Sequence, residues 1–397
     1  MRHDLIEIEK FVDEILPQVV EIRHHIHANP ELSLKEYNTS KFIRKQLSEI
    51  NVNILPPFLE TDVIAILNES KVNKNITLRA DIDALPIQEK STLSYSSNNN
   101  GIMHACGHDG HTAILLGTAF VLNKFKDLLD GSVRFVFQPG EEVVAGGRDL
   151  VKKGILENPE PNAVLAFHGW PGYPIGSICS RPGTLMAAAD VFKITLTAEG
   201  GHGSKSNLKN NPIFIASEII KELSLIPTKH FSSEKVVVSV SKIIGGSNPN
   251  VIPTKVILEG SVRYLEKVEG EKIPGLFEDI IHKTSIGTNV NCELEYQRPY
   301  IPTVNNSEVI STCKKIVKEY IGEKDWIDIE APVMTSEDFS YYIDENPGAM
   351  FFLGMGDESE LLHTDRYNFN DEAIKNGILF LVISTVEFLS KADIFNK

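Results

Sequence analysis

The sequence contains little cysteine: four residues in 397, Cys106, Cys179, Cys292 and Cys313, with no Cys-x-x-Cys pair. Cysteines that are so few and so far apart in the sequence do not form a disulfide scaffold, and they suit a reducing compartment. A Lys/Arg-rich run is also absent, and 39 basic residues against 54 acidic ones give a formal charge of −15. Because the resulting field repels phosphate, we expect no nucleic-acid partner.

Long hydrophobic runs are absent as well. The N-terminal segment carries a charge every few residues and lacks the apolar core of a secretory signal. The longest apolar stretch, Ile378 to Leu389, contains Glu387 and falls short of the roughly 20 apolar residues that a membrane span needs. We therefore expect a buried helix there, no membrane partner and a cytoplasmic protein.

The length of the chain exceeds the size at which one hydrophobic core stops growing, so at least two domains are expected. Apolar strand-like runs alternate with amphipathic helical stripes in residues 1–183 and again in 298–397, which is typical of an α/β domain with a parallel or mixed sheet. Residues 184–297 follow the β-α-β-β-α-β order of a ferredoxin-like α+β unit. The sequence thus predicts a domain in two pieces, 1–183 and 298–397, with a smaller domain inserted at 184–297.

The periodicity of the apolar residues sets the expected elements. The expected helices are 5–26, 39–50, 111–125, 145–153, 212–225, 269–284, 307–321 and 371–389. The expected strands are 63–67, 76–80, 133–138, 163–167, 191–198, 236–243, 256–264, 290–296 and 350–353.

Residues able to bind metal are densest in His104-Ala-Cys-Gly-His-Asp-Gly-His111, at the mouth of a predicted helix. Cysteine thiolates and histidine imidazoles bind zinc and related ions, and Cys106 and His108, two residues apart on a loop, can converge on one ion. His111 lies a turn further on, where it could instead cap the helix or pack. The alternative, a free buried cysteine with incidental histidines, fits this density less well.

Two adjacent carboxylates, Glu141 and Glu142, follow the predicted strand 133–138. Burying them without a partner would be costly, and a cation would remove that cost. Because adjacent residues in an extended segment point to opposite sides, one could bind metal while the other faces a bound water as general base. Taken alone, such a pair is more often the solvated start of a helix.

Two further histidines follow predicted strands or loops of the same domain. His168 comes directly after an apolar strand, where α/β sheets place ligands, and His363 lies in Leu361-Leu-His-Thr-Asp365. Singly, each is more often a structural residue. Together with Cys106, His108 and one of the two glutamates, these histidines offer five ligands. Five ligands and a water are more than one tetrahedral ion needs, which favours two ions sharing a bridging ligand.

Two other histidine patterns are not assigned to the metal. His24 and His27 share a helix face at i and i+3, but they end an amphipathic helix, where histidine complements the dipole. His108-Asp109 resembles the pair found in helical metal phosphohydrolases. Those are all-α folds, and they leave Glu141-Glu142 without a role.

Three segments resemble the dinuclear metallopeptidase and amidohydrolase family of aminoacylases and carboxypeptidases: Arg79-Ala-Asp-Ile-Asp-Ala-Leu-Pro86, Met103-His-Ala-Cys-Gly-His-Asp-Gly-His111 and Phe137-Gln-Pro-Gly-Glu-Glu142. The similarity runs nearly end to end, through Asn250-Val-Ile-Pro253 and Ser336-Glu-Asp-Phe339 to His363. It is closest to the amidohydrolase branch, with hippurate hydrolase, N-acetyldiaminopimelate deacetylase and indoleacetyl-amino-acid hydrolases. The resemblance implies a zinc-peptidase-like α/β catalytic domain with an inserted ferredoxin-like lid or dimerisation domain.

The resemblance also implies a role for each matching residue. Cys106 matches the ligand that bridges two metals, and the other matching ligands are His108, Glu142, His168 and His363. Glu141 matches the general base, and Asp81 an acidic residue beside the site. On the inserted domain, His202 matches a histidine that stabilises the oxyanion, often across a dimer, while Asn250 and Arg263 match the pair that binds the carboxylate of the substrate.

The implied reaction is hydrolysis of the amide bond of an N-acyl (acetyl, benzoyl or similar) amino acid. A water would bridge two divalent ions (Zn, Mn, Co or Ni), and Glu141 would take a proton from that water. A dipeptidase or carboxypeptidase of the same family is an alternative. A non-catalytic metal-binding protein is another, although the intact Glu141 argues against it. The expected partners are a small N-acyl amino acid or peptide substrate and further copies of the chain, in a homodimer or higher homo-oligomer.

Overall fold

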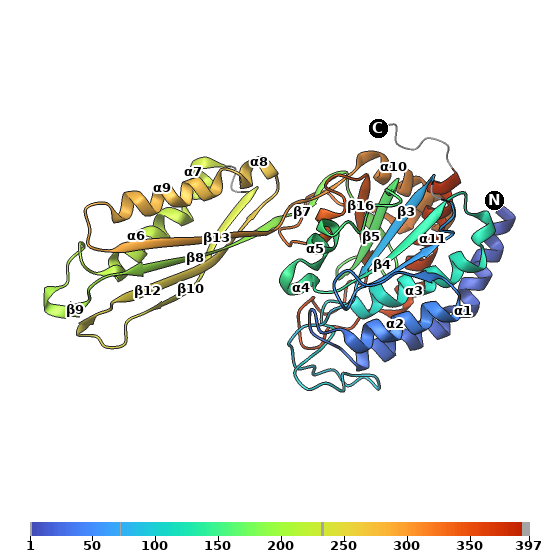
Figure 1. Cartoon of the computed structure of the whole chain (residues 1–397), viewed down its shortest axis with the longest axis horizontal. Coiled ribbons are helices and arrows are strands. Elements are labelled where there is room, and N and C mark those ends of the chain that lie inside the picture. Colours follow the sequence, from blue (N-terminus) through green and yellow to red (C-terminus); the bar gives the residue numbers. More distant parts are fainter. Residues whose placement is uncertain (1, 72, 232–233, 391–397) are drawn as a thin grey trace. The chain divides into compact units, whose positions relative to one another are not determined.

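The computed structural model describes residues 2–71, 73–231 and 234–390. The chain forms two compact units (Figure 1). The large unit comprises residues 1–185, 304–331 and 338–397, and the small unit comprises 186–303 and 332–337. The small unit therefore extends beyond the predicted range 184–297 at its C-terminal end and includes a short later segment. That it acts as a lid or in dimerisation stays a prediction.

The described part of the large unit is built on an eight-stranded mixed sheet in the order β1-β2-β4-β3-β5-β16-β6-β15. The central neighbours β4-β3, β3-β5 and β5-β16 are parallel, whereas β1-β2, β2-β4 and β16-β6 are antiparallel. The strands are β1 (Asn53–Ile54), β2 (Val63–Leu67), β3 (Asn75–Asp81), β4 (Ser132–Gln138), β5 (Ala163–Trp170), β6 (Ile178–Ser180), β15 (Trp326–Asp328) and β16 (Gly348–Gly354). This confirms the predicted α/β fold, and it places the carboxyl ends of β3, β4 and β5 at one edge.

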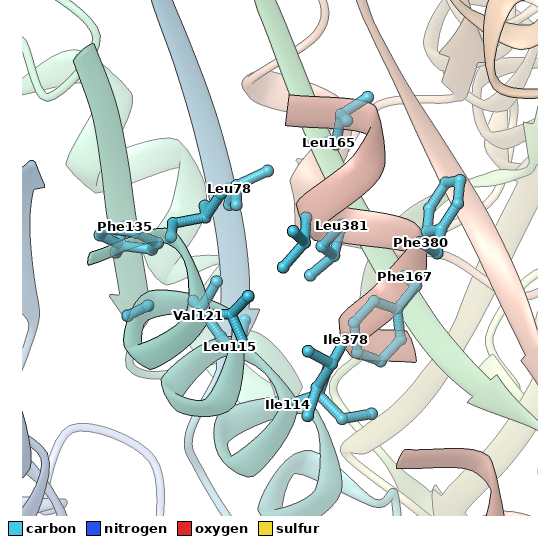
Figure 2. Packing of buried hydrophobic residues seen from close by; sticks show 14 of the residues in the cluster. Leu78, Ile114, Leu115, Val121, Phe135, Leu165, Phe167, Ile378, Phe380 and Leu381 are labelled. Atoms are coloured by element: carbon cyan, nitrogen blue, oxygen red, sulfur yellow. The ribbon is translucent and has the colours of Figure 1, made fainter. Parts of the chain in front are cut away.

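Helices cover this sheet and close its core. They are α1 (Arg2–Ala28), α2 (Tyr37–Glu49), α3 (His108–Lys124), α4 (Glu141–Val144), α5 (Gly146–Lys152), α10 (Ser307–Ile316) and α11 (Ile374–Ser390). Single turns of 3-10 or π-helix are η1 (Lys126–Leu128), η3 (Val317–Ile321), η4 (Glu323–Asp325), η5 (Asp338–Tyr341) and η6 (Asp371–Ala373). In Figure 2, Ile114 of α3 lies beside Ile378 of α11, and both belong to one buried cluster with Leu115 of α3 and Leu78 of β3. Each such buried side chain contributes about 1.5–3 kcal/mol relative to an exposed one.

One helical stretch in the described part of the chain, Asp371–Ser390, is long and apolar enough to cross a membrane by composition. In the large unit, 72% of its most apolar window is buried. Ile378 and Leu381 pack in the core beside α3 (Figure 2). The prediction of a buried helix in this stretch is therefore confirmed.

The small unit contains a four-stranded antiparallel sheet in the order β10-β12-β8-β13. Its strands are β8 (Ala188–Thr197), β10 (Val236–Gly245), β12 (Lys255–Tyr264) and β13 (Asn291–Tyr300). Its helices are α6 (Pro212–Ser224), α7 (Ile226–His230), α8 (Lys267–Gly270) and α9 (Ile273–Ser285), with the turn η2 (Gly203–Lys205). A separate two-stranded ribbon joins β9 (Gly201–His202) to β11 (Val251–Ile252) at one end of this sheet (Figure 1). Strands β7 (Gly183–Met186) and β14 (Thr303–Asn305) lie where the chain passes from one unit to the other.

The predicted β-α-β-β-α-β order is present in the small unit, with one correction. The sequence predicted a single helix over 269–284, but the structure has two, α8 and α9. Pro274 lies in the first turn of α9, where its missing N–H is not needed and its fixed φ favours a helix start. The proline therefore begins a new helix and does not lie within a longer one.

Asp190 is a buried carboxylate in the core of the small unit. It accepts hydrogen bonds from the hydroxyls of Tyr264, at 3.2 Å, and Tyr296, at 2.9 Å, and lies 3.5 Å from the guanidinium of Arg298. Burial outweighs these favourable contacts and raises the pKa of Asp190 to about 6. The pKa of an aspartate in an unfolded chain is about 3.9. Between this pH and a pH of about 6, the native protein therefore retains a proton that the unfolded chain loses.

The substitution Asp190→Asn should therefore stabilise the protein at neutral pH. Because the folded pKa is raised, Asp190 lowers the free energy of unfolding as pH rises from about 4 to about 6. An asparagine, which stays neutral, should increase the free energy of unfolding at pH 7 by about 1–3 kcal/mol and change it little at pH 4. Urea denaturation at both pH values is the measurement. An equal destabilisation at both would contradict this account of Asp190.

Candidate metal centre

The candidate ligands lie where β3, β4 and β5 end in the large unit. Asp81 is the last residue of β3, and His168 lies near the end of β5. The two glutamates begin α4, which two residues separate from the end of β4. His108 is the first residue of α3. The structure therefore brings together residues from distant parts of the sequence, because the carboxyl ends of neighbouring parallel strands share one edge.

Cys106 lies at the centre of this group. Its Sγ is 3.3 Å from Nε2 of His168 and 3.2 Å from Nε2 of His363. This thiol belongs to two sets of ligand atoms, and within each set all atoms lie within 4.8 Å of one another. The first set is Cys106, His108 and His168, and the second is Cys106, Glu142 and His363. The five residues predicted as ligands thus fall into two triads that share one cysteine, which is the arrangement needed for a bridging ligand.

The donor atoms of these residues fit divalent ions. Among the described residues, Nε2 of His108 is buried without a hydrogen-bond partner and lies 3.9 Å from Oε1 of Glu142. An orphaned buried nitrogen is costly unless something binds it. Burial and the neighbouring carboxylates of Glu142 and Glu141 raise the pKa of the Cys106 thiol well above its ordinary range, so the thiolate needs a cation beside it. A thiolate, imidazoles and a carboxylate suit Zn, Mn, Co or Ni.

Asp83 orients two of these ligands and was not assigned from the sequence. Its carbonyl oxygen lies 2.9 Å from Nδ1 of His108 and its Oδ1 lies 3.3 Å from the same nitrogen. Its Oδ2 accepts from the backbone N–H of Glu142 at 3.1 Å and from Ser33 Oγ at 2.6 Å. With Nδ1 held in this way, Nε2 is the nitrogen of His108 left for a metal. The second aspartate of Arg79-Ala-Asp-Ile-Asp83 was the available signal.

His111 has both ring nitrogens engaged. The backbone N–H of Gly169 donates to Nε2 at 2.8 Å, so the ring proton is on Nδ1, which donates to Oδ1 of Asp81 at 2.6 Å. His111 therefore joins the end of β3 to β5 beside His168. This resolves the role that the sequence left open in favour of positioning. Asp81 also lies next to His108, with Oδ2 at 3.6 Å from Nε2 of that histidine.

Arg79 is fully buried and ties three segments together beneath the site. Its guanidinium donates to Asp81 at 2.8 Å, to Gln138 at 2.9 Å and to Asp338 at 2.8 Å. Asp338 also accepts from the backbone N–H of Gly147 at 2.7 Å. Both Arg79 and Asp338 stand in motifs that carried the family resemblance, but only the folded chain shows that they meet.

The local geometry of the glutamates differs from the expectation. An extended segment was expected to point Glu141 and Glu142 to opposite sides, but the structure begins helix α4 at Glu141, directly after Gly140 with its left-handed φ of 68°. In a helix, successive side chains diverge by about 100°, so that argument was wrong. Both carboxylates still reach the site, because oxygens of the two residues and a nitrogen of His108 lie within 4.8 Å of one another. Glu141 is buried, with 7% of its surface exposed.

Helix α3 begins three residues earlier than expected, at His108 and not at His111. Gly107, just before it, has a left-handed φ of 85°, which glycine adopts without strain. Gly110 packs so closely on Phe369 that a Cβ atom would lie 2.4 Å from the ring. The two glycines therefore let the ligand turn pass close beneath the loop that carries His363.

His363 adopts a left-handed φ of 63°. For a residue other than glycine, such a conformation costs about 1–3 kcal/mol and is found mainly at functional sites. The backbone N–H of His363 donates to the carbonyl of Ala105 at 2.8 Å, which holds the strained residue next to Cys106. The sequence indicated the histidine but gave no sign of the strain.

In the small unit, His202 and Asn250 lie together. His202 is exposed and pairs with Val251 between β9 and β11, and the carbonyl of Asn250 accepts from Gly203 N at 2.7 Å. The backbone N–H of Ser204 donates to Nδ1 of His202 at 3.2 Å, so neutral His202 carries its proton on Nε2. That tautomer is the one able to donate a hydrogen bond to an oxyanion.

Arg263 lies at the other end of the same sheet. It is paired with Ala189, near the start of β8, and its Nη1 donates to the carbonyl of Met334 at 2.8 Å. The path along β12 from Lys255, next to the His202 ribbon, to Arg263 spans about 26 Å at 3.3 Å per residue. Within one small unit, the structure therefore does not bring Arg263 to His202 or Asn250.

The chain is similar to known peptidases and deacetylases over most of its length. The model of peptidase family M20/M25/M40 matches residues 77–383. The chain is 34% identical to thermostable carboxypeptidase 1 of Saccharolobus solfataricus, covering 98% of this chain and all of the relative. It is 35% identical to N-acetyl-L-cysteine deacetylase of Bacillus subtilis, covering 95% and 89%. A crystal structure of a dinuclear metal-binding peptidase from B. subtilis matches with a TM-score of 0.83 and 30% identity, covering 95% and 99%.

The fold, the ligand triads and these similarities define the class of protein: a metal-dependent hydrolase of amide bonds, of the amidohydrolase and peptidase type. Within that class, the chain belongs to peptidase family M20/M25/M40. This confirms the family resemblance of the sequence motifs.

Proposed function

We propose that this enzyme hydrolyses the amide bond of N-acyl amino acids, using two divalent ions held by the ligand triads that share Cys106. The observation that carries the proposal is this sharing of one thiol, with the buried Glu141 carboxylate within 4.8 Å of His108. The similarity to an N-acetyl-L-cysteine deacetylase supports the choice of substrate. All four cysteines are free, which suits the reducing cytoplasm that we propose as its compartment.

In the proposed mechanism, each residue has a distinct task. The bound ions would supply Lewis acidity and lower the pKa of a water toward ~7. The Glu141 carboxylate takes the proton of the attacking water and later delivers it to the leaving nitrogen. His202 donates Nε2–H to the oxygen that becomes negative, and Arg263 or Asn250 binds the carboxylate of the amino acid. The bond broken is the C–N bond of the amide, and the products are a carboxylate and an amine.

The small unit supports a dimer as the working form. One substrate the size of an N-acyl amino acid cannot contact both His202 and Arg263 of one copy, because about 26 Å of β12 separates them. A second copy that contributes His202 removes this conflict. The outermost strand β10 also exposes Val237, Ile243 and Ile244, apolar side chains that a second chain could cover.

His202→Ala should lower kcat by about 10²–10³-fold, which is typical for loss of one oxyanion donor. Metal content should not change, because His202 is not among the candidate ligands. Steady-state kinetics with metal-loaded protein would measure this. A kcat within twofold of wild type would contradict the role of His202.

Mixing two inactive variants tests whether His202 acts in a second copy. His202→Ala and Glu141→Gln each damage a different part of the site. If His202 acts across a two-fold dimer, mixed dimers contain one intact site, and about a quarter of wild-type activity should return after subunit exchange. If His202 acts within its own chain, neither site of the mixed dimer is complete, and no activity returns.

A substrate panel tests the reaction itself and its main alternative. N-acetyl and N-benzoyl amino acids and dipeptides should be compared, each with Zn, Mn, Co or Ni added to stripped protein. Turnover of N-acyl amino acids above that of dipeptides supports the proposal. The opposite preference would favour a dipeptidase or carboxypeptidase, a candidate supported by the similarity to a thermostable carboxypeptidase.

A further inference from the structure

A buried ionic cluster lies beside the turn that carries Cys106 and His108. Asp109, in the first turn of α3, has its Oδ2 3.0 Å from Nη1 of Arg23 and 2.8 Å from Nδ1 of His27. All three side chains have no exposed surface. Arg23 and His27 come from α1, so the cluster joins the N-terminal helix to the helix that begins with a candidate metal ligand.

His27 carries this cluster on to a second segment. Its Nε2 lies 3.3 Å from Oε1 of Glu89, and Oε2 of Glu89 accepts from the backbone N–H of Ser97 at 2.6 Å. Both ring nitrogens of His27 thus face carboxylates, which an imidazolium satisfies and a neutral ring does not. Burial alone would lower the pKa of His27, but Asp109 and Glu89 outweigh it and raise that pKa to about 9.

This arrangement differs from the role expected for the histidines at the end of α1. They were expected to complement the helix dipole, but His27 is turned inward and fully buried. It belongs to none of the candidate metal groups in the described part of the chain, which agrees with leaving it out of the ligand set. Its contacts with Asp109 and Glu89 give it a different task.

Few side chains of the ligand turn itself can hold it in place. Gly107 and Gly110, which flank His108 and Asp109, have no side chains. Glu89 and Ser97 belong to the long connection between β3 and α3, which also contains Cys106. The cluster therefore holds both the turn and the connection against α1.

We propose that Asp109 is a positioning residue of the metal centre, whose carboxylate, clamped between Arg23 and His27, fixes the places of His108 and Cys106. The inference rests on the proposed ligands, and it assigns no contact between Asp109 and metal or substrate. Loss of the clamp should weaken metal binding even in folded protein, because partners that orient ligands typically contribute 10–100-fold in metal affinity.

Asp371 provides a matched control. It pairs with the other side of the same guanidinium, at 2.5 Å from Nε of Arg23, and with His24 at 2.8 Å. It belongs to the turn before α11 and not to the ligand turn. Asp371→Asn therefore removes an ion pair of Arg23 without touching Asp109, so it measures what loss of a charge near α1 does to stability alone.

The test measures cobalt binding to metal-free protein, by chelator competition and by the visible absorption spectrum of the bound ion. In Asp109→Asn, the dissociation constant should rise about 10–100-fold and the spectrum should change. In Asp371→Asn, both should match wild type. A folded Asp109→Asn variant with wild-type affinity and spectrum would overturn the proposal.

His27→Gln keeps the test decisive if Asp109→Asn does not fold. The amide of glutamine can donate to Asp109 but carries no charge and cannot also reach Glu89, so cobalt binding should weaken by several-fold. Unchanged binding in this variant would also overturn the proposal.

The variant Cys106→Ala distinguishes an error in the proposed ligands from an error in the proposed role of Asp109. If Cys106→Ala binds cobalt as wild type does, the proposed ligands are wrong, whatever the effect of Asp109→Asn.

Discussion

The substitution Cys106→Ala should abolish binding of both metal ions and reduce amide hydrolysis to background. Sγ of Cys106 belongs to both ligand triads. It lies 3.3 Å from Nε2 of His168 in one triad and 3.2 Å from Nε2 of His363 in the other. Each ion would therefore lose one of its three protein ligands. Because loss of an orienting partner alone costs about 10–100-fold in affinity, loss of the shared ligand should weaken both sites by more than about 100-fold.

Elemental analysis of dialysed protein measures this effect, and Cys179→Ala is its control. Cys179 is also buried and free, but it lies in β6 and belongs to neither triad. That variant should keep its metal and its activity. Two ions retained in Cys106→Ala would contradict a shared thiol ligand.

The substitution Glu141→Gln should lower kcat by about 10²–10⁴-fold, the usual contribution of a positioned acid–base group, while metal content persists. The amide has nearly the shape of the carboxylate but cannot take the proton of the attacking water. Since Glu141 belongs to neither triad that contains Cys106, the ions should remain bound.

The neighbouring substitution Glu142→Gln gives the contrast that identifies the two roles. Glu142 belongs to the triad with Cys106 and His363, so its loss should release metal as well as activity. Metal analysis and single-turnover kinetics on both variants measure the difference. Unchanged turnover in Glu141→Gln, or metal loss equal in the two variants, would contradict the assignment of Glu141 as base.

Much of the fold could be predicted because its elements have strong local patterns. The stripe of isoleucines and valines in α1 and the fully buried strands β3 and β4 left little ambiguity. The errors lie where a tertiary contact or a single residue decides. Pro274 starts a new helix, and α3 begins at His108 because Gly107 turns the chain just before it.

The site, like the fold, could be predicted from the sequence only in part. Its ligands could be predicted because they are chemically distinctive and follow strands that end at one edge of the sheet. Asp83, Arg79 and Asp109 could not be given roles, because each acts on a partner far away in the sequence. Arg79 meets Asp338, and Asp109 meets Arg23 and His27, only after folding. A local sequence pattern does not show which residues far apart in the sequence will come into contact.

The most direct test of the central claim is a titration of metal-free wild-type protein with Zn, Mn, Co or Ni, followed by hydrolysis of N-acyl amino acids. Two triads sharing Cys106 predict that activity appears with added metal and reaches its maximum when two ions are bound per chain. An absence of metal-dependent hydrolysis across the panel, or full activity with one ion bound, would contradict the account.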